Sequence, residues 1–454
     1  MSAVRPYVWN LLRLAGPVAL ARLGIIGMAL ADVIVVGQLT PAQLPHQALG
    51  WAPTAVFLVT GIGLLNGVQV LAARALGEKK PEGAGLALRR GLVLSLFAGA
   101  AAALAMWWGG ERLFTTFGIS PELAAPSARV MNVLALSIPL HLAYIAATYF
   151  LEAIKRPGIS TAVMWASNAV NLALNLLWVP HWGAVGSAWA TVGARLFLAG
   201  MTLLWIMLMK DRARFGLDRL GGAGPSYGAL LAVGSAAAVS QAVEAGAFSS
   251  MTVIAGRLGA NAVAAYQILL NVLALVFMVA LGLAAASAVL VSEAIGRGAP
   301  RDAGRAGWTA LGLNTLAMLA CSAICLALPH PISRAYTADV SLAALIAADL
   351  WIAALVFAPD GAQVVTSSSL RARGDNWFPT FSHILAYAMV MPALGYWLGE
   401  HERMGARGLV FAIAASSVLS AAVLIGRWAY LTRSHASPDK PRSGADPGPN
   451  IVAS

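Results

Sequence analysis

Three carboxylates lie inside long apolar stretches of the sequence: Asp32, Glu244 and Asp360. A charged side chain at the centre of a membrane costs at least about 2.5–3.5 kcal/mol, so such a group normally faces a cavity or a partner. Apolar surroundings favour the uncharged carboxyl group, which makes each acid a candidate proton carrier. Together with neutral oxygens, the acids also suit Na⁺, a hard cation that prefers oxygen ligands. The alternative for each is a structural ion pair, for which Arg22 and Arg195 are the available partners inside apolar stretches.

Neutral polar side chains inside apolar stretches are candidates for supporting the acids or binding substrate. Asn171 and Asn175 are one helical turn apart and share a face, as do Gln267 and Asn271, and Thr191 lies in the apolar stretch after the two asparagines. Polar side chains also join helices within membranes, so helix packing is the alternative role for each of these residues.

The composition indicates the elements that must position these groups. The chain of 454 residues is 59% hydrophobic and 11% charged, with a mean hydropathy of +0.75. Soluble domains carry roughly 25% charged residues, and a soluble fold could not bury this much apolar surface. Apolar segments of about 20 residues or more predict transmembrane helices. We therefore expect an all-α integral membrane protein with twelve transmembrane helices at 10–36, 47–76, 84–108, 126–152, 159–180, 184–209, 227–256, 260–295, 303–328, 340–371, 377–398 and 406–432.

The second half of the sequence repeats features of the first. Gly-Ala-Val-Gly-Ser-Ala-Trp-Ala at 183–190 returns as Gly-Ala-Arg-Gly-Leu-Val-Phe-Ala at 405–412, and Gly77 returns as Gly296. An even number of helices per half gives both halves the same orientation, and duplication in a membrane protein indicates a transporter whose substrate site lies between the halves. We expect two pseudo-symmetric six-helix lobes, 1–209 and 227–433, with a cytoplasmic linker at 210–226 and a disordered cytoplasmic tail at 434–454.

The charge distribution predicts the topology. Of the 30 Lys and Arg residues, 22 fall on the side of the N-terminus, six on the opposite side, and two within spans. This asymmetry places both termini of a multi-pass membrane protein in the cytoplasm. The net charge of +11 does not indicate nucleic acid, because the basic residues are scattered through short loops. The cysteines, Cys321 and Cys325, lie one turn apart in one span and predict neither a disulfide framework nor a metal site.

Several segments resemble one known family. Leu-Ala-Gly-Pro-Val at 14–18 and Ala-Asp-Val-Ile-Val-Val-Gly at 31–37 resemble the first helix of multidrug and toxic compound extrusion (MATE) transporters. Val243-Glu244, Ala-Ala-Tyr-Gln-Ile-Leu-Leu-Asn at 264–271 and Asp-Gly-Ala-Gln-Val-Val at 360–365 are similar to the NorM branch of that family, and Ser-Leu-Arg-Ala-Arg-Gly at 369–374 is similar to the cytoplasmic end of its tenth helix. The resemblance covers nearly the whole chain except the tail.

The resemblance implies a cation-coupled antiporter that expels amphipathic, often cationic compounds by alternating access, driven by H⁺ or Na⁺. It implies cation coupling at Asp32, with Asn171, Asn175 and Thr191 nearby. It also implies coupling at the pair Glu244 and Asp360, a possible Na⁺ site, with Gln267 and Asn271 nearby. Family members proposed to bind a cation in the N-lobe often have Asp where this chain has Asn175. That departure argues against a tight N-lobe Na⁺ site and leaves proton coupling through Asp32 open.

Other classes of membrane protein would require different sequence features. A flippase for a lipid-linked precursor, from the same superfamily, is the nearest alternative, but it should have a strongly basic cavity for pyrophosphate. An embedded hydrolase needs a motif such as His-Glu-x-x-His or Gly-x-Ser-x-Gly, and neither is found. A passive channel is less consistent with duplicated halves that carry unequal acids. We expect a monomer that is not an enzyme and has no cofactor beyond its coupling ion, with small amphipathic or cationic drugs and the lipid bilayer as partners.

Overall fold

The structure is a computed structural model that describes residues 5–116, 118–218, 224–337 and 339–433. The predicted disordered tail at 434–454 and part of the linker lie outside the described residues. The described chain is almost entirely helical. The α-helices of the first half are α1 (Arg5–Leu39), α2 (Leu44–Leu64), α3 (Asn66–Gly77), α4 (Pro81–Thr116), α5 (Pro121–Ala153) and α6 (Pro157–Leu208). Those of the second half are α7 (Tyr227–Arg257), α8 (Ala260–Gly296), α9 (Pro300–Ala327), α10 (Pro329–Tyr336), α11 (Val340–Arg373), α12 (Trp377–His383), α13 (Met391–Tyr396) and α14 (Ala406–Arg433).

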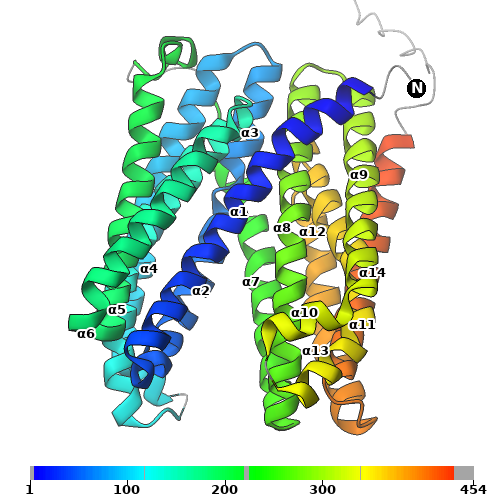
Figure 1. Ribbon diagram of the computed structural model, residues 1–454. Helices are drawn as coiled ribbons and strands as arrows, with labels where there is room; N and C mark the ends of the chain where they lie inside the picture. Colours follow the sequence, from blue (N-terminus) through cyan, green and yellow to red (C-terminus); the bar gives the residue numbers. More distant parts are fainter. Residues whose placement is uncertain (1–4, 117, 219–223, 338, 434–454) are drawn as a thin grey trace, which may run out of the picture.

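Eleven helical segments within the described ranges are long and apolar enough to cross a membrane, where the sequence predicts twelve spans. The difference arises at α6, whose 52 residues cover the two predicted spans 159–180 and 184–209. The helix is interrupted at Gly183, where φ is +56° and ψ is −135°. Only glycine adopts such a conformation readily, so the chain can turn sharply there. Figure 1 shows the two parts of α6 as a hairpin at one edge of the molecule.

Two other predicted spans are interrupted. The predicted span 47–76 is divided into α2 and α3 at Leu65. The predicted span 377–398 consists of α12, a π-helical segment (Ile384–Val390), α13 and the start of a second π-helical segment (Trp397–His401). Such π-helical segments are rare, and they often lie at functional sites. The short helix α10, between predicted spans, was not foreseen from the sequence.

The helices form two groups that meet at one end of the molecule and diverge at the other (Figure 1). The first group contains α2–α6 and the second contains α7–α14. The helix α1 runs diagonally between them: it packs against α6 of the first group and against α8 and α9 of the second. Further contacts between the groups join α2 and α3 to α7, and α3 to α8. A polar side chain on α1 can therefore contribute to either group.

Large apolar side chains occupy both the interior and the outer surface. Phe150 and Trp428 belong to a buried cluster that includes residues from both groups. At the same time Phe97, Trp108 and Leu208 are 73%, 85% and 70% exposed. Extensive exposed apolar surface is unfavourable in water but suits contact with lipid. Together with the candidate spans, this surface identifies a multi-pass membrane protein.

Candidate coupling and substrate sites

Asp32 on α1 lies in a pocket of the first helical group, only 7% exposed. Its Oδ1 accepts hydrogen bonds from Nδ2 of Asn171 at 2.9 Å and from Nδ2 of Asn175 at 2.6 Å. Its Oδ2 accepts one from Oγ1 of Thr191 at 2.8 Å. The structure thus brings together four of the residues that the sequence singled out. Their role in cation coupling stays a prediction.

The hairpin of α6 explains how these side chains meet. Asn171 and Asn175 lie on the part before Gly183, and one turn of helix places them on the same face. Thr191 lies on the part after Gly183, which turns back alongside the first. Three donors directed at one carboxylate stabilise its ionised form, since hydrogen bonds to a charged acceptor are the stronger kind.

The pocket beside Asp32 has a volume of about 310 Å³ and a mostly apolar lining that includes Leu44, Trp51, Val130 and Leu134. Arg195 borders a smaller adjoining cavity of about 20 Å³. Its Nη1 donates to Oγ of Ser137 at 2.6 Å, and its guanidinium lies 5.4 Å from the ring centroid of Trp51. The sequence analysis considered Arg195 as an ion-pair partner for the membrane acids. In the structure it makes no ion pair with Asp32.

Asp360 on α11 is an acid of the second group. Its Oδ1 accepts hydrogen bonds from the Tyr387 hydroxyl at 3.3 Å and from Oγ of Ser417 at 3.2 Å, with Nε2 of Gln363 at 3.5 Å. Oε1 of Gln363 is buried and has no hydrogen-bond partner. Carboxylate, hydroxyl and amide oxygens are ligands that a hard cation prefers. This cluster therefore contains oxygen ligands suitable for Na⁺. The sequence analysis missed Tyr387 and Ser417, although both are polar residues within predicted spans.

Glu244 on α7 is separate from that cluster. It lines the cavity between the two groups of helices and makes no hydrogen bond or ion pair in the described part of the chain. Gln267 and Asn271, expected near the acidic pair, bond elsewhere. Nε2 of Gln267 donates to Oγ1 of Thr252 at 3.3 Å, and Nδ2 of Asn271 donates to the Gln267 carbonyl at 2.9 Å.

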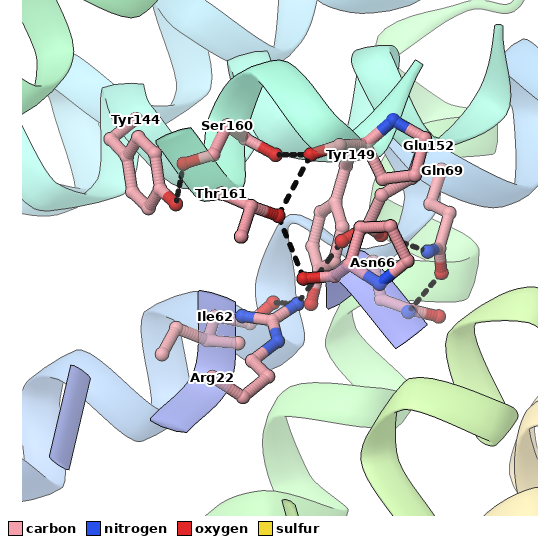
Figure 2. Close-up of polar contacts among 11 residues, drawn as sticks. Arg22, Ile62, Asn66, Gln69, Tyr144, Tyr149, Glu152, Ser160 and Thr161 are labelled. Carbon is pink, nitrogen blue, oxygen red and sulfur yellow. Dashed lines mark hydrogen bonds and ion pairs between the residues drawn. The ribbon is translucent and has the colours of Figure 1, made fainter. Parts of the chain in front are cut away.

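A third polar cluster, which the sequence analysis missed, surrounds Glu152 on α5 (Figure 2). Oε1 of Glu152 lies 3.7 Å from Nη2 of Arg22, and Oε2 accepts from Nε2 of Gln69 at 2.5 Å. The Arg22 guanidinium is 5.7 Å from the ring centroid of Tyr149. Arg22 was recognised as a candidate for ion pairing, but Glu152 falls at the last residue of its predicted span and so reads as a loop residue.

A cavity of about 330 Å³ lies between the two groups of helices. Its charged lining residues are Arg22, Glu244 and Arg371, and Gln69 and Gln241 add amides. The remaining lining is largely apolar and comes from α1, α2, α3, α5, α7, α8 and α11. Drug-sized ligands typically occupy cavities of about 300–1,000 Å³ with this kind of lining. The cavity thus has the size and position expected of a substrate site between halves.

The fold and these sites define a class: helical membrane transporters with a cavity between two helical groups. The MatE family model matches residues 17–177 and 236–397, once in each half of the chain. The chain belongs to the MatE family, the MATE transporters that its motifs resemble. A probable multidrug resistance protein NorM of Caulobacter vibrioides is 41% identical over 93% of this chain and 91% of its own length. Another from Deinococcus radiodurans is 33% identical over 93% and 95%.

Solved structures show the same fold at lower identity. The eukaryotic MATE transporter AtDTX14 matches with a TM-score of 0.85 and 17% identity, over 95% of this chain and 98% of its own. A multidrug resistance MATE family transporter of the MOP superfamily, in an outward-facing conformation, matches with a TM-score of 0.85 and 20% identity, over 93% and 96%.

Proposed function

We propose that this protein is a multidrug efflux antiporter, which exports amphipathic, often cationic compounds in exchange for H⁺ or Na⁺. The relatives just described are named multidrug resistance proteins, and their similarity extends over nearly the whole chain. The observation that carries the proposal is the enclosed Asp32 site, where a membrane-embedded carboxylate beside a pocket is held by three hydrogen-bond donors. A charged carboxylate inside a membrane is energetically unfavourable, and acids at such positions commonly mark pathways for ions or protons.

The proposed topology has twelve crossings, six in each lobe, with the two parts of α6 counted separately. The lobes are residues 1–209 and 227–433, and both termini lie in the cytoplasm of the bacterial inner membrane. The excess of Lys and Arg on that side supports this orientation. The lobes meet at the end of the molecule where the N-terminus lies (Figure 1). In the proposed orientation, the divergence of the two groups at the opposite end supports assignment to the outward-facing state of an alternating-access cycle.

The proposed mechanism is competition for carboxylates. Asp32, Glu244 and Asp360 are the coupling acids, and a site that accommodates one positive occupant at a time exchanges a cationic drug for H⁺ or Na⁺. A ligand shifts an equilibrium between conformations only by its difference in affinity for them. Binding of a proton or Na⁺ in the outward-facing state, and of drug in the inward-facing state, supplies that difference. Asn171, Asn175 and Thr191 position Asp32, while Gln267 and Asn271 support the second lobe from outside the acidic cluster.

The test is transport by purified protein in liposomes. Ethidium movement is followed under an imposed Na⁺ gradient or, separately, an imposed pH gradient. Acceleration by one gradient alone identifies antiport and the coupling ion. If folded protein responds to neither gradient, the antiporter proposal fails, and flipping of a fluorescent lipid-linked pyrophosphate then tests the alternative.

A further inference from the structure

His141 on α5 is a buried histidine that makes no hydrogen bond to another residue of the described chain. Its side chain lies in the interior, at 4% exposure. Its ring contacts that of Tyr144, with the centroids 5.9 Å apart, but Nδ1 of His141 is buried and has no hydrogen-bond partner. Buried polar groups are normally hydrogen-bonded, and one that is not calls for an explanation such as a bound water or a role in proton transfer.

The small cavity of about 20 Å³ beside Asp32 supplies that explanation. His141, Asp32, Thr191 and Arg195 contribute its polar lining. Nε of Arg195 is a second buried nitrogen without a partner. A cavity needs about 10–15 Å³ to hold one water, and the water needs two to four polar partners. The small cavity therefore has the size and the lining for a single water between His141 and the Asp32 carboxyl group.

Asp32 separates this small cavity from the larger pocket of about 310 Å³. Val33, which follows Asp32 on α1, lines the larger pocket, whereas Ile25, which precedes it, lines the small cavity. In the proposed topology the N-terminus is cytoplasmic, so the small cavity lies on the cytoplasmic side of Asp32. Ile25 also lines the cavity between the two groups of helices. The small cavity thus lies between the Asp32 carboxyl group and that central cavity.

The charged groups near the small cavity limit how His141 can act. Asp32 and Arg195 line the cavity, and Arg22, the charged residue before Asp32 on α1, is paired with Glu152. The Arg195 guanidinium disfavours a lasting positive charge on the imidazole, so His141 suits brief protonation.

The other acidic, basic and histidine residues of α5, and of α2, α3, α4, α6 and α8 that pack against it, lie within about three turns of a helix end or of the turn at Gly183. They are His46, Arg74, Glu82, Arg89, Arg90, Glu111, Arg112, Glu122, Arg129, His181 and Glu293.

We propose that His141 is the residue to which Asp32 passes its proton on the cytoplasmic side, through a water in the small cavity. The Asp32 carboxyl group gives its proton to the water, and the water gives one of its own to a ring nitrogen of His141. Asp32 is left as a carboxylate and the imidazole carries the charge. After the change of conformation, water that enters past Ile25 takes the proton from the same nitrogen, and the ring is neutral again.

This inference rests on the proposed antiport function and assigns H⁺ as the ion that Asp32 exchanges. A proton can pass along hydrogen bonds from a carboxyl group through one water to an imidazole. Na⁺ has no such route, because it would have to move through the small cavity as an ion. His141 is therefore a proton-transfer residue, and its removal should affect coupling to the proton rather than the binding of drug.

The experiment compares proton-driven export with an exchange that needs no proton transfer. Purified protein in liposomes exports ethidium under an imposed pH gradient and, separately, exchanges radiolabelled for unlabelled ethidium without a gradient. His141→Gln keeps a hydrogen-bonding side chain but cannot carry the proton. Proton-driven export should fall at least about tenfold, the low end of what a proton-transfer group contributes, while exchange stays within about twofold.

The matched control is His181→Gln, because His181 is exposed and is not among the residues that line the small cavity. Both rates should equal those of the wild-type protein. Thermal unfolding of each variant identifies loss of fold. If His141→Gln does not fold, His141→Asn decides by the same ratio of proton-driven export to exchange.

Equal loss of proton-driven export and exchange in His141→Gln would assign His141 a structural role and overturn the proposal, as would unchanged proton-driven export. Wild-type export that responds to a Na⁺ gradient alone would overturn the proton route and leave the antiporter proposal standing. A wild-type protein that responds to neither gradient would remove both.

Discussion

Gly77 on α3 and Gly296 on α8, which occupy matching positions in the two halves of the sequence, pack against each other where the two groups of helices meet. A Cβ atom added to Gly77 would lie 3.0 Å from the Cα of Gly296 and 2.1 Å from the carbonyl oxygen of Glu293. One added to Gly296 would lie 2.1 Å from the carbonyl oxygen of Arg74. The repeated glycine therefore lets two backbones approach closely on both sides of one interface, as small residues do between membrane helices.

Substitution of Gly77 by valine should destabilise this closed interface. The added side chain meets backbone rather than a flexible side chain, and overpacking of this kind costs typically about 1–3 kcal/mol. We expect Gly77→Val to lower ethidium export by about tenfold and to increase labelling of a cysteine placed in the interface between α3 and α8. Gly200→Val is the control, because no atom outside its own turn of helix backbone lies within 4 Å of a Cβ atom built at Gly200. Equal export by the two variants would show that the close packing does not matter for transport.

Removal of the Asp32 carboxylate should abolish coupling, and removal of one donor should weaken it. Asp32→Asn removes the negative charge that a cation would neutralise, so we expect export to fall at least about tenfold at normal expression. Thr191→Val removes one hydrogen bond to a charged acceptor, worth about 1.5–3 kcal/mol, and should give a smaller loss. Ion-driven ethidium export in liposomes measures both. Wild-type rates in Asp32→Asn would contradict the assignment of this acid.

Drug export should depend on Asp360 and on the two hydroxyl groups that donate hydrogen bonds to it. We expect Asp360→Asn to reduce drug export without preventing membrane insertion. Tyr387→Phe and Ser417→Ala each remove one donor to Oδ1 and should reduce export several-fold, because a single hydrogen bond contributes about 0.5–1.5 kcal/mol. Ser249→Ala is a suitable control, since that hydroxyl bonds only its own helix, at the Ala245 carbonyl. Normal export by Asp360→Asn at full expression would remove Asp360 from the mechanism.

Thermal unfolding of single and double variants should reveal the pairing of Arg22 with Glu152. Glu152 is 2% exposed at its side chain and Arg22 is 12% exposed. Breaking a buried pair typically costs about 3–5 kcal/mol because one charge is left uncompensated. We expect Glu152→Gln to lower the thermal unfolding midpoint, and Arg22→Gln combined with Glu152→Gln to restore much of it. If the two losses simply add, the residues do not interact energetically, and Gln69 is the partner that matters to Glu152.

The acids show which parts of the site can be predicted from the sequence. Asp32, Glu244 and Asp360 stand out because a carboxylate in an apolar stretch conflicts with its surroundings, and the spacing of Asn171 and Asn175 predicts a shared face. Glu152 was missed because it lies at the edge of a predicted span, where a charged residue is ordinary. Tyr387 and Ser417 were missed because hydroxyl groups are common in membrane helices, and nothing local distinguishes those that meet an acid.

The sequence by itself determined that the chain is a helical membrane protein, the approximate limits of most helices, the duplication and the family. The first three properties follow from local transfer free energies and from repeated residues, which each segment carries independently of the others. The family follows from the resemblance of motifs such as Ala-Asp-Val-Ile-Val-Val-Gly at 31–37. Only the tertiary structure decided which partners each acid meets. Thr191 lies 159 residues from Asp32, and it reaches that carboxylate because the chain turns back at Gly183.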